Sequence, residues 1–322
     1  MSMTSEGLWY LGERSLEIRP LEVPDPAPDE VLVEIEACGI CTWDIVSYLG
    51  KFGRYQRYPF CAGHEGVGRV VRTGPRVTTA KQGQRVVLHE VPVGTPGGAL
   101  MARHAVRPQR QVAVVPEGPI PIHHWIVEPA ACIVNGILYA GIQPGDRVAL
   151  VGAGYMGLLF VQALRKTLAS RVCAFDVQAD RLALAARLGA SQTWNLKDRP
   201  VSAEVARSFD VVIETAGTQE SLKTALAVLR PGGILENFAW HHHEASFDLE
   251  DWHVNGWRIL NVQPGMNPHF GDLYPRTISL IEAGVISNAE LVTHWGPVSK
   301  AKEIFESAAD KTNGYVKGVI TF

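Results

Sequence analysis

The sequence predicts an α/β protein with two domains: a β-rich domain and a doubly wound parallel sheet. Three observations predict this class. Before about residue 120, segments alternate apolar and polar side chains between glycine and proline turns, as half-buried strands do. After residue 130, apolar strand-like runs alternate with amphipathic helix-like segments at the spacing of βαβ units. A glycine-rich turn, G-x-G-x-x-G, joins one of these strands to the helix that follows it.

The β-rich part contains three strand candidates, residues 30–40, 65–74 and 84–91. Beyond it, the run at 146–154 begins as a short, continuously apolar strand, which is typical of a parallel sheet covered on both faces. The other predicted strands are 171–176, 209–217 and 232–239, the last one after a Pro-Gly-Gly turn. The predicted helices are 130–141, 155–166, 179–190, 220–230, 273–286 and 298–310. A final strand, 314–322, could return to the β-rich domain.

The composition excludes several classes of function. The chain has 322 residues, 46% of them hydrophobic, and a net charge of −3, so it has no electrostatic footprint for nucleic acid or an anionic membrane. No apolar run is long enough to span a bilayer, and no basic segment followed by an apolar core opens the sequence. Five scattered cysteines do not suggest a disulfide framework. We expect a cytoplasmic protein that acts on a small molecule.

The glycine-rich turn consists of Gly152, Gly154 and Gly157, with Tyr155 and Met156 between the last two. The first glycine permits a tight turn, the second lets the backbone approach a pyrophosphate, and the third lets helix and strand pack closely. The free N–H groups at the start of the helix then face the phosphates. Because a strand precedes the motif and a helix follows it, we predict a Rossmann domain that binds a dinucleotide.

Asp176 ends the next predicted strand, about 20 residues further on, where the dinucleotide fingerprint has an acidic residue. Its carboxylate would accept hydrogen bonds from the ribose hydroxyls and repel a 2′-phosphate, which favours NAD(H) over NADP(H). Arg181 could weaken that preference, although the surface of the helix is an alternative place for it.

Residues 63–77 and 38–44 together resemble the zinc-containing medium-chain dehydrogenase/reductase family, which comprises alcohol and polyol dehydrogenases. The first segment is similar to the family's Gly-His-Glu signature at Gly63, His64, Glu65, Gly68, Gly74 and Val77. The second, "CGICTWD", is similar to its Cys-Gly-x-Cys-x-x-Asp stretch. The resemblance implies a GroES-like β-barrel catalytic domain over 1–129 and 261–322, a Rossmann domain over 130–260, and a homodimer joined through edge strands of the Rossmann sheets.

The resemblance also implies one catalytic zinc. Cys41 and His64 would be ligands, and Glu65 would be a ligand or lie just outside the coordination sphere. Glu128, in a segment similar to the polyol-type "Glu-Pro-Leu", would be the third protein ligand, with Cys132 as the alternative. Asp44 would accept the imidazole N–H of His64. Residues 89–106 contain no cysteine, so we expect no second, structural zinc.

Trp43 departs from the family pattern, which has serine or threonine there to pass on the substrate proton. Val46 also replaces a histidine of that relay. Thr42, Tyr48 or Glu65 could move the proton instead, or the substrate could need little help. Alternatively, no alkoxide forms, because hydride goes to a conjugated C=C or C=N bond. Trp43 could be a wall of the substrate pocket, or it could simply pack between the domains.

We therefore expect a zinc- and NAD(H)-dependent oxidoreductase that interconverts a polar secondary alcohol, of the sugar, cyclitol or polyol type, and its ketone. The alternatives are an NAD(P)H-dependent reductase of a conjugated C=C or C=N bond, and a non-catalytic NAD(H)-binding protein. By resemblance, Phe238 would bond the nicotinamide carboxamide through its backbone. The run His241 to His243 could line the pocket or a subunit contact, or be solvated surface.

Overall fold

The structure is a computed structural model that describes residues 2–53, 57–88, 99–242 and 244–322. The chain forms two compact units. The first comprises residues 1–129, 271–279 and 287–322, and the second comprises 130–270 and 280–286. Among the residues that the structure describes, no helix has the length and apolar character needed to cross a bilayer.

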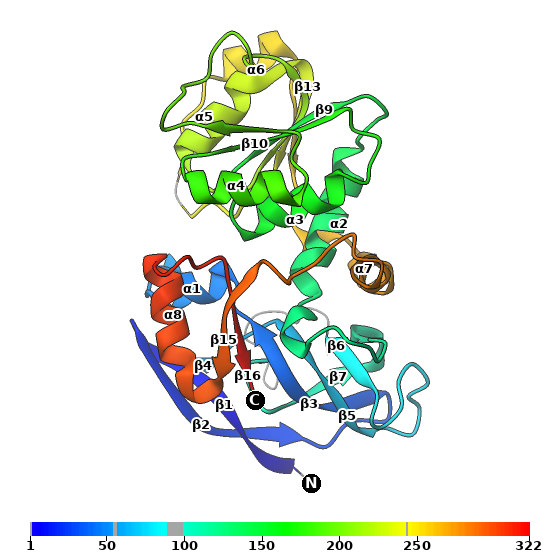
Figure 1. The fold of residues 1–322 in the computed structure, drawn as a ribbon. Coiled ribbons are helices and arrows are strands. Elements are labelled where there is room, and N and C mark those ends of the chain that lie inside the picture. Colours follow the sequence, from blue (N-terminus) through cyan, green and yellow to red (C-terminus); the bar gives the residue numbers. More distant parts are fainter. Residues whose placement is uncertain (1, 54–56, 89–98, 243) are drawn as a thin grey trace. The chain divides into compact units, whose positions relative to one another are not determined.

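The first unit is built on two sheets (Figure 1). The smaller sheet has the order β2-β1-β4, from Ser15–Pro24, Ser2–Gly12 and Phe60–Cys61. The larger has the order β15-β16-β3-β5-β6-β8, and β7 also pairs with β3. Its strands are Val292–Pro297 (β15), Lys317–Thr321 (β16), Glu30–Gly39 (β3), Glu65–Thr73 (β5), Arg85–Leu88 (β6), Val112–Val114 (β8) and His104–Pro108 (β7). The C-terminal strand β16 is antiparallel to β3.

Two α-helices belong wholly to the first unit. Helix α1, Thr42–Tyr48, follows β3 directly, and α8, Ala301–Asp310, lies beside β15 and β16 (Figure 1). Tyr10 of β1 and Phe305 of α8 are fully buried, and their rings meet edge to face in the apolar core of this unit. Single 3₁₀ turns occupy Gln109–Gln111, Ile122–His124 and Val298–Lys300.

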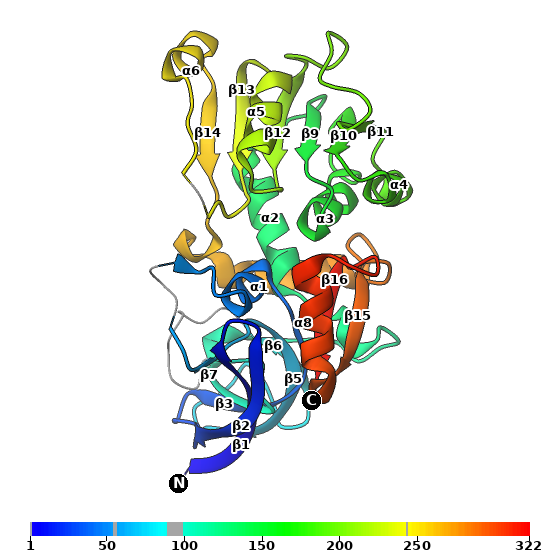
Figure 2. The same ribbon diagram turned by 90° about the vertical axis from the view of Figure 1, so that its left-hand side faces the viewer.

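The second unit is a six-stranded parallel sheet flanked by helices. Its order is β11-β10-β9-β12-β13-β14, which Figure 2 shows side by side and which is the doubly wound dinucleotide-binding order. The strands are Gln192–Asn195 (β11), Arg171–Asp176 (β10), Arg147–Val151 (β9), Phe209–Glu214 (β12), Leu229–Asn237 (β13) and Arg258–Asn261 (β14). Strand β9 lies where the order reverses, between β10 and β12, so the turn after it opens at the edge where such sheets bind ligands.

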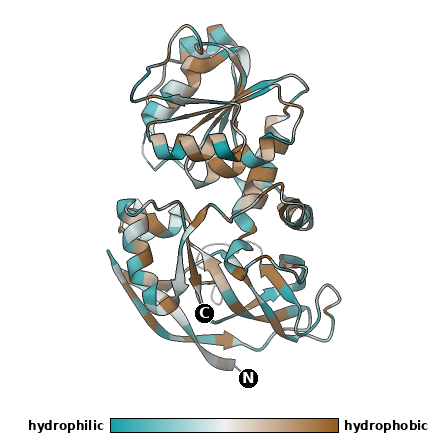
Figure 3. Ribbon diagram, viewed as in Figure 1, coloured by the Kyte–Doolittle hydropathy of each residue, from teal (hydrophilic) through white to brown (hydrophobic). Residues whose placement is uncertain are grey.

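The helices of the second unit are α3 (Tyr155–Leu164), α4 (Ala179–Leu188), α5 (Gln219–Val228) and α6 (Leu249–Asn255). Figure 1 shows α3 and α4 on one face of the sheet and α5 and α6 on the other. Much of the central strands is hydrophobic in Figure 3, as the double covering requires. Helices α2 (Glu128–Ala140) and α7 (Leu273–Glu282) each have residues in both units, and Pro264–Met266 and Phe270–Asp272 are 3₁₀ turns.

One strand begins earlier than the sequence predicts. The Pro-Gly-Gly segment at 231–233 is expected to be a turn before the strand, but β13 already starts at Leu229. Leu229 pairs with Phe209 of β12, and the next pair is Ile234 with Val211, so the segment forms an irregularity inside the strand. Residues before and after the Pro-Gly-Gly segment pair with β12, and this pairing outweighs the turn preference of the segment.

Candidate active site

Three side chains that can bind a metal converge in the first unit. The ligand atoms of Cys41, His64 and Glu65 all lie within 4.8 Å of one another. The antiparallel pairing of β3 with β5 places Gly39 opposite Glu65, so the residues just after β3 meet those at the start of β5. In the parts of the chain that the structure describes, no other three such side chains converge in this way.

Glu65 is paired with a lysine that the sequence does not single out. Lys317 Nζ lies 2.7 Å from Oε1 and 2.6 Å from Oε2 of Glu65, and it also donates to the Ile40 carbonyl at 2.9 Å. Both side chains are buried. Burial lowers the pKa of Lys317, but the charge of Glu65 outweighs it and holds the pKa above its usual value. A Cβ on Gly39 would come within 1.9 Å of Glu65 Oε2, so glycine is required there.

Glu128 is the first residue of α2 and is almost fully buried. Its charge contributes to the raised pKa of both His64 and Lys317, so its carboxylate lies within electrostatic reach of the cluster. It is not among the three side chains whose ligand atoms converge most tightly. Cys132 is a buried cysteine one turn further along α2, and it is not in that set either.

Asp44 holds the start of α1 rather than the ring of His64. Its Oδ2 accepts the backbone N–H of Cys41 at 2.8 Å, and its Oδ1 accepts the hydroxyl of Tyr10 at 3.4 Å. The hydrogen bond expected from His64 is not formed, and the two side chains interact through charge. Burial raises the pKa of Asp44 to about 6, against the opposing effect of His64.

The side chains considered for proton transfer differ in their surroundings. Thr42 is exposed at the start of α1. The hydroxyl of Tyr48 donates to Glu306 at 2.6 Å, so it braces α1 against α8. Trp43 is half-buried, and its ring is perpendicular to that of His64, with 6.2 Å between centroids. Two candidates for proton transfer therefore remain: Thr42, which is exposed to solvent, and Glu65, which belongs to the metal cluster.

The glycine-rich turn of the second unit has the backbone that a pyrophosphate site needs. Gly152 has a φ of +106°, and Gly154 caps the start of α3, so Tyr155 and Met156 form its first turn. A Cβ on Gly157 would lie 2.0 Å from the carbonyl oxygen of Gly152, so only glycine lets α3 pack this closely on β9.

Asp176 lies at the carboxyl end of β10, beside this turn. Its Oδ2 accepts the N–H of Ala153 at 2.6 Å, and its Oδ1 accepts the N–H groups of Val177 and Gln178 at 2.7 and 2.8 Å. These bonds fix the carboxylate next to the glycine motif and still leave lone pairs for ribose hydroxyls. Arg181 is half-buried in α4.

The end of β12 contains a buried pair that the sequence does not indicate. Glu214 accepts the N–H groups of Ala216 and Gly217 at 2.7 and 2.8 Å, and His241 Nε2 lies 2.9 Å from its Oε2. At least one residue of the histidine run, His241, therefore lies at the carboxyl end of β12. The N–H of Phe238 donates to the Glu214 carbonyl at 3.1 Å, which leaves only the Phe238 carbonyl for a carboxamide.

Comparison with known proteins agrees with both units. The model of the alcohol dehydrogenase GroES-like domain matches residues 27–117, and that of the zinc-binding dehydrogenase domain matches residues 156–281. The chain belongs to the zinc-type medium-chain alcohol and polyol dehydrogenase family. It is thus an oxidoreductase with a GroES-like domain and a Rossmann domain, as the sequence predicts.

Three relatives of this dehydrogenase illustrate the match. Sorbitol dehydrogenase of Bacillus subtilis is 26% identical over 337 residues, which cover 95% of this chain and 94% of that protein. An Escherichia coli oxidoreductase/dehydrogenase of unknown specificity has a TM-score of 0.90 at 25% identity and covers 99% of each chain. A putative zinc-binding dehydrogenase of Sinorhizobium meliloti, bound to NADP, has a TM-score of 0.86 at 25% identity and covers 99% of this chain and 100% of its own.

The cluster of this dehydrogenase fits a catalytic zinc. Thiolate, imidazole and carboxylate are the donors that zinc takes, and three protein donors are the number found in catalytic sites. The cation of Lys317 already offsets the charge of Glu65, which makes the donor set less negative than its thiolate and carboxylate suggest. The expected absence of a structural zinc concerns residues 89–106, of which 89–98 lie outside the described residues.

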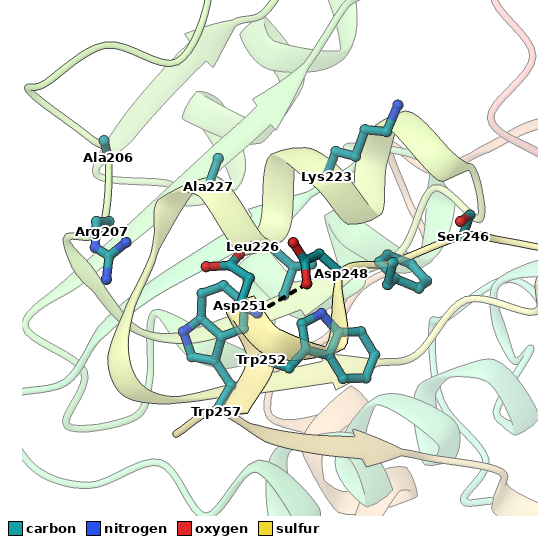
Figure 4. Close-up of a pocket in the computed structure, with 11 residues that line it drawn as sticks. Ala206, Arg207, Lys223, Leu226, Ala227, Ser246, Asp248, Asp251, Trp252 and Trp257 are labelled. Carbon is teal, nitrogen blue, oxygen red and sulfur yellow. Dashed lines mark hydrogen bonds between the residues drawn. The ribbon is translucent and has the colours of Figure 1, made fainter. Parts of the chain in front are cut away.

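A hollow of about 440 Å³ in the second unit contains none of the predicted site residues (Figure 4). Trp252 and Trp257 line it between α5 and α6. The carboxylate of Asp248 caps α6 through the N–H groups of Glu250 and Asp251, and the indole N–H of Trp257 donates to the Arg230 carbonyl. These groups serve the packing of α6, so we assign no chemistry to this hollow.

Proposed function

We propose that this dehydrogenase interconverts a polar secondary alcohol, of the sugar, cyclitol or polyol type, and its ketone, with one zinc and NAD(H). The observation that carries the proposal is the convergence of Cys41, His64 and Glu65, with Glu128 beside them. The carboxylates of Glu65 and Glu128 favour a polyol dehydrogenase over other alcohol dehydrogenases, because the segment around Glu128 resembles the polyol-type "Glu-Pro-Leu". Relatives named sorbitol dehydrogenase, D-arabinitol dehydrogenase and probable D-xylulose reductase agree with this substrate class.

The chain's residues have distinct tasks in this reaction. Cys41, His64 and Glu65 would hold the zinc, which when bound polarises the substrate oxygen and lowers the pKa of its hydroxyl. Asp44 fixes the backbone at Cys41 by accepting its N–H, and the hydroxyl of Tyr10 donates to the same carboxylate. Lys317 offsets the charge of the Glu65 carboxylate and holds it in place.

A proton must leave the substrate hydroxyl without a serine or threonine at position 43. We infer that the exposed Thr42 takes this part, because Tyr48 is engaged with Glu306 and Glu65 with Lys317. The same change at position 43 is what favours the second candidate, a reductase of conjugated C=C or C=N bonds, in which no alkoxide forms.

We infer NAD(H) rather than NADP(H) as the cofactor. The glycine-rich turn supports a pyrophosphate site, and the Asp176 carboxylate fixed beside it would repel a 2′-phosphate. A relative of 25% identity is bound to NADP. The preference of this chain for NAD(H) over NADP(H) therefore has to be measured directly. We also infer a homodimer formed through an edge strand of the parallel sheet, β11 or β14.

The proposal is tested by turnover with the zinc-loaded protein. We expect NADH to form from NAD⁺ with secondary alcohols of the polyol or cyclitol type, with kcat/KM at least about tenfold higher for NAD⁺ than for NADP⁺. The panel also contains enones and cyclic imines, assayed with NADH and NADPH. Turnover of enones or imines alone would replace the proposal with the reductase. No turnover of any compound, together with tight NADH binding, would indicate a binding protein.

A further inference from the structure

Three half-buried aromatic side chains lie together, and one of them, Trp43, faces His64. The Trp43 ring is 4.8 Å from that of Phe52 and 6.0 Å from that of Phe60, measured between centroids, and 6.2 Å from the ring of His64. All three contacts of Trp43 are edge to face, the arrangement that aromatic pairs favour. We call Trp43, Phe52 and Phe60 the aromatic wall.

The wall is anchored in the core but is not part of its interior. Phe60 stacks on the fully buried Tyr10 at 4.9 Å with 7° between the rings, and Tyr10 in turn bonds Asp44. Trp43 and Phe60 only border the core cluster of the first unit, and each keeps part of its surface exposed. A tryptophan that served only to fill the core would be covered, as Trp194 is in the second unit.

The position of Trp43 is fixed by the same elements as the metal cluster. Cys41 caps α1, and Trp43 is the second residue of that helix. The bond from the Cys41 N–H to Asp44 sets the first turn, so the indole is held rigidly next to a metal ligand. Rigid, partly exposed aromatic surface at a binding site gives contact area at little entropic cost.

This surface fits one shape of polyol better than another. A ring-form sugar or cyclitol can present a face of C–H bonds while its hydroxyls point outward around the rim, so the face packs on an indole without losing hydrogen bonds. An open-chain polyol has a hydroxyl on every carbon and no lasting apolar face, so packing on the wall would bury hydroxyls without partners.

We propose that the aromatic wall makes this dehydrogenase selective for cyclic polyols, cyclitols or pyranoses, over open-chain polyols. Trp43 is the specificity-determining residue, because it is the member of the wall in contact with His64. The inference rests on the proposed function, since it concerns which alcohol reaches the metal. It predicts a preference for ring-form alcohols, whereas the name of the sorbitol dehydrogenase relative refers to an open-chain polyol.

The test compares Trp43→Ser with Trp43→Phe and with Trp295→Ser, a control that removes an exposed tryptophan of β15 in the same unit. Zinc content and melting temperature are measured first, so that misfolded variants are recognised. Then kcat and KM are determined for myo-inositol and for sorbitol. Dissociation constants for both compounds are measured by calorimetry with zinc and NADH bound.

We expect the wild type to favour myo-inositol. Trp43→Ser should raise KM and Kd for myo-inositol roughly tenfold or more, the scale of one lost aromatic stacking contact, and leave the values for sorbitol unchanged or lower. Trp43→Phe should lose less, and Trp295→Ser nothing. Equal losses for both compounds, or a wild-type preference for sorbitol, would overturn the inference. If neither alcohol is oxidised, the proposed function fails, while the calorimetric comparison still decides whether the wall selects the ring.

Discussion

Lys317→Met is expected to lower the melting temperature of the zinc-free protein by about 10 °C, because it leaves the Glu65 carboxylate buried without its cation. Removing one partner of a buried ion pair costs about 3–5 kcal/mol. Methionine preserves the length of the side chain, so the loss reports charge rather than packing. The measurement is a thermal melt in a strong chelator.

Zinc should reduce this loss. A bound ion supplies positive charge at Glu65, so the difference between Lys317→Met and the wild type should shrink by about half or more when one equivalent of zinc is present. Lys302→Met, which removes an exposed lysine of α8, is the matched control and should change little. An identical loss with and without zinc would show that Glu65 lies outside the reach of the metal.

Glu236→Gln is expected to remove a pH dependence of stability from the second unit. Glu236 is fully buried in β13, and neither of its carboxylate oxygens has a hydrogen-bond partner among the described residues. A Cβ on Gly136 of α2 would come within 2.5 Å of its Oε1, so the carboxyl group fills the space at that glycine. Burial alone raises the pKa of Glu236 to about 8.

The direction of the effect follows from proton linkage. Between the unfolded pKa of about 4.5 and the folded pKa of about 8, the folded chain holds a proton that the unfolded chain has released. The free energy of unfolding therefore falls as the pH rises through this range and levels off above it. The total loss is on the order of 5 kcal/mol, because each unit of difference between the two pKa values contributes about 1.4 kcal/mol.

Glutamine has the same shape and no charge, so Glu236→Gln should equal the wild type near pH 5 and melt at a clearly higher temperature near pH 9. Glu244→Gln, which changes an exposed residue of the same unit, is the control for surface charge. Thermal melts between pH 5 and 9 provide the measurement. Parallel curves for Glu236→Gln and the wild type would contradict the assignment of a neutral, buried acid.

Local pattern was sufficient for the four central strands of the parallel sheet, but it did not predict the short edge strands β11 and β14. Strand β10 covers the predicted residues 171–176, because a short apolar run between turn residues has few alternatives. The glycine motif lies between β9 and α3, where its spacing places it. Helices α1 and α6, each seven residues long, carry no periodic signal long enough to predict them.

The side-chain pairs that the structure brings together could not be predicted from the sequence, because their partners are far apart along the chain. Lys317 and Glu65 are separated by 252 positions, and only the pairing of β16 with β3 and of β3 with β5 brings them together. Glu214 and His241 meet across 27 positions at one end of the parallel sheet. The one weak signal was a lysine standing alone in the apolar segment that forms β16.

The central claim is that Cys41, His64 and Glu65 hold a single zinc. The most direct test is the zinc content of purified, zinc-loaded and desalted protein, measured by mass spectrometry for the wild type and Cys41→Ala. The account predicts one zinc per chain in the wild type and less than about a tenth of that in Cys41→Ala. A wild-type chain that retains no zinc, or a Cys41→Ala chain that retains as much as the wild type, would contradict it.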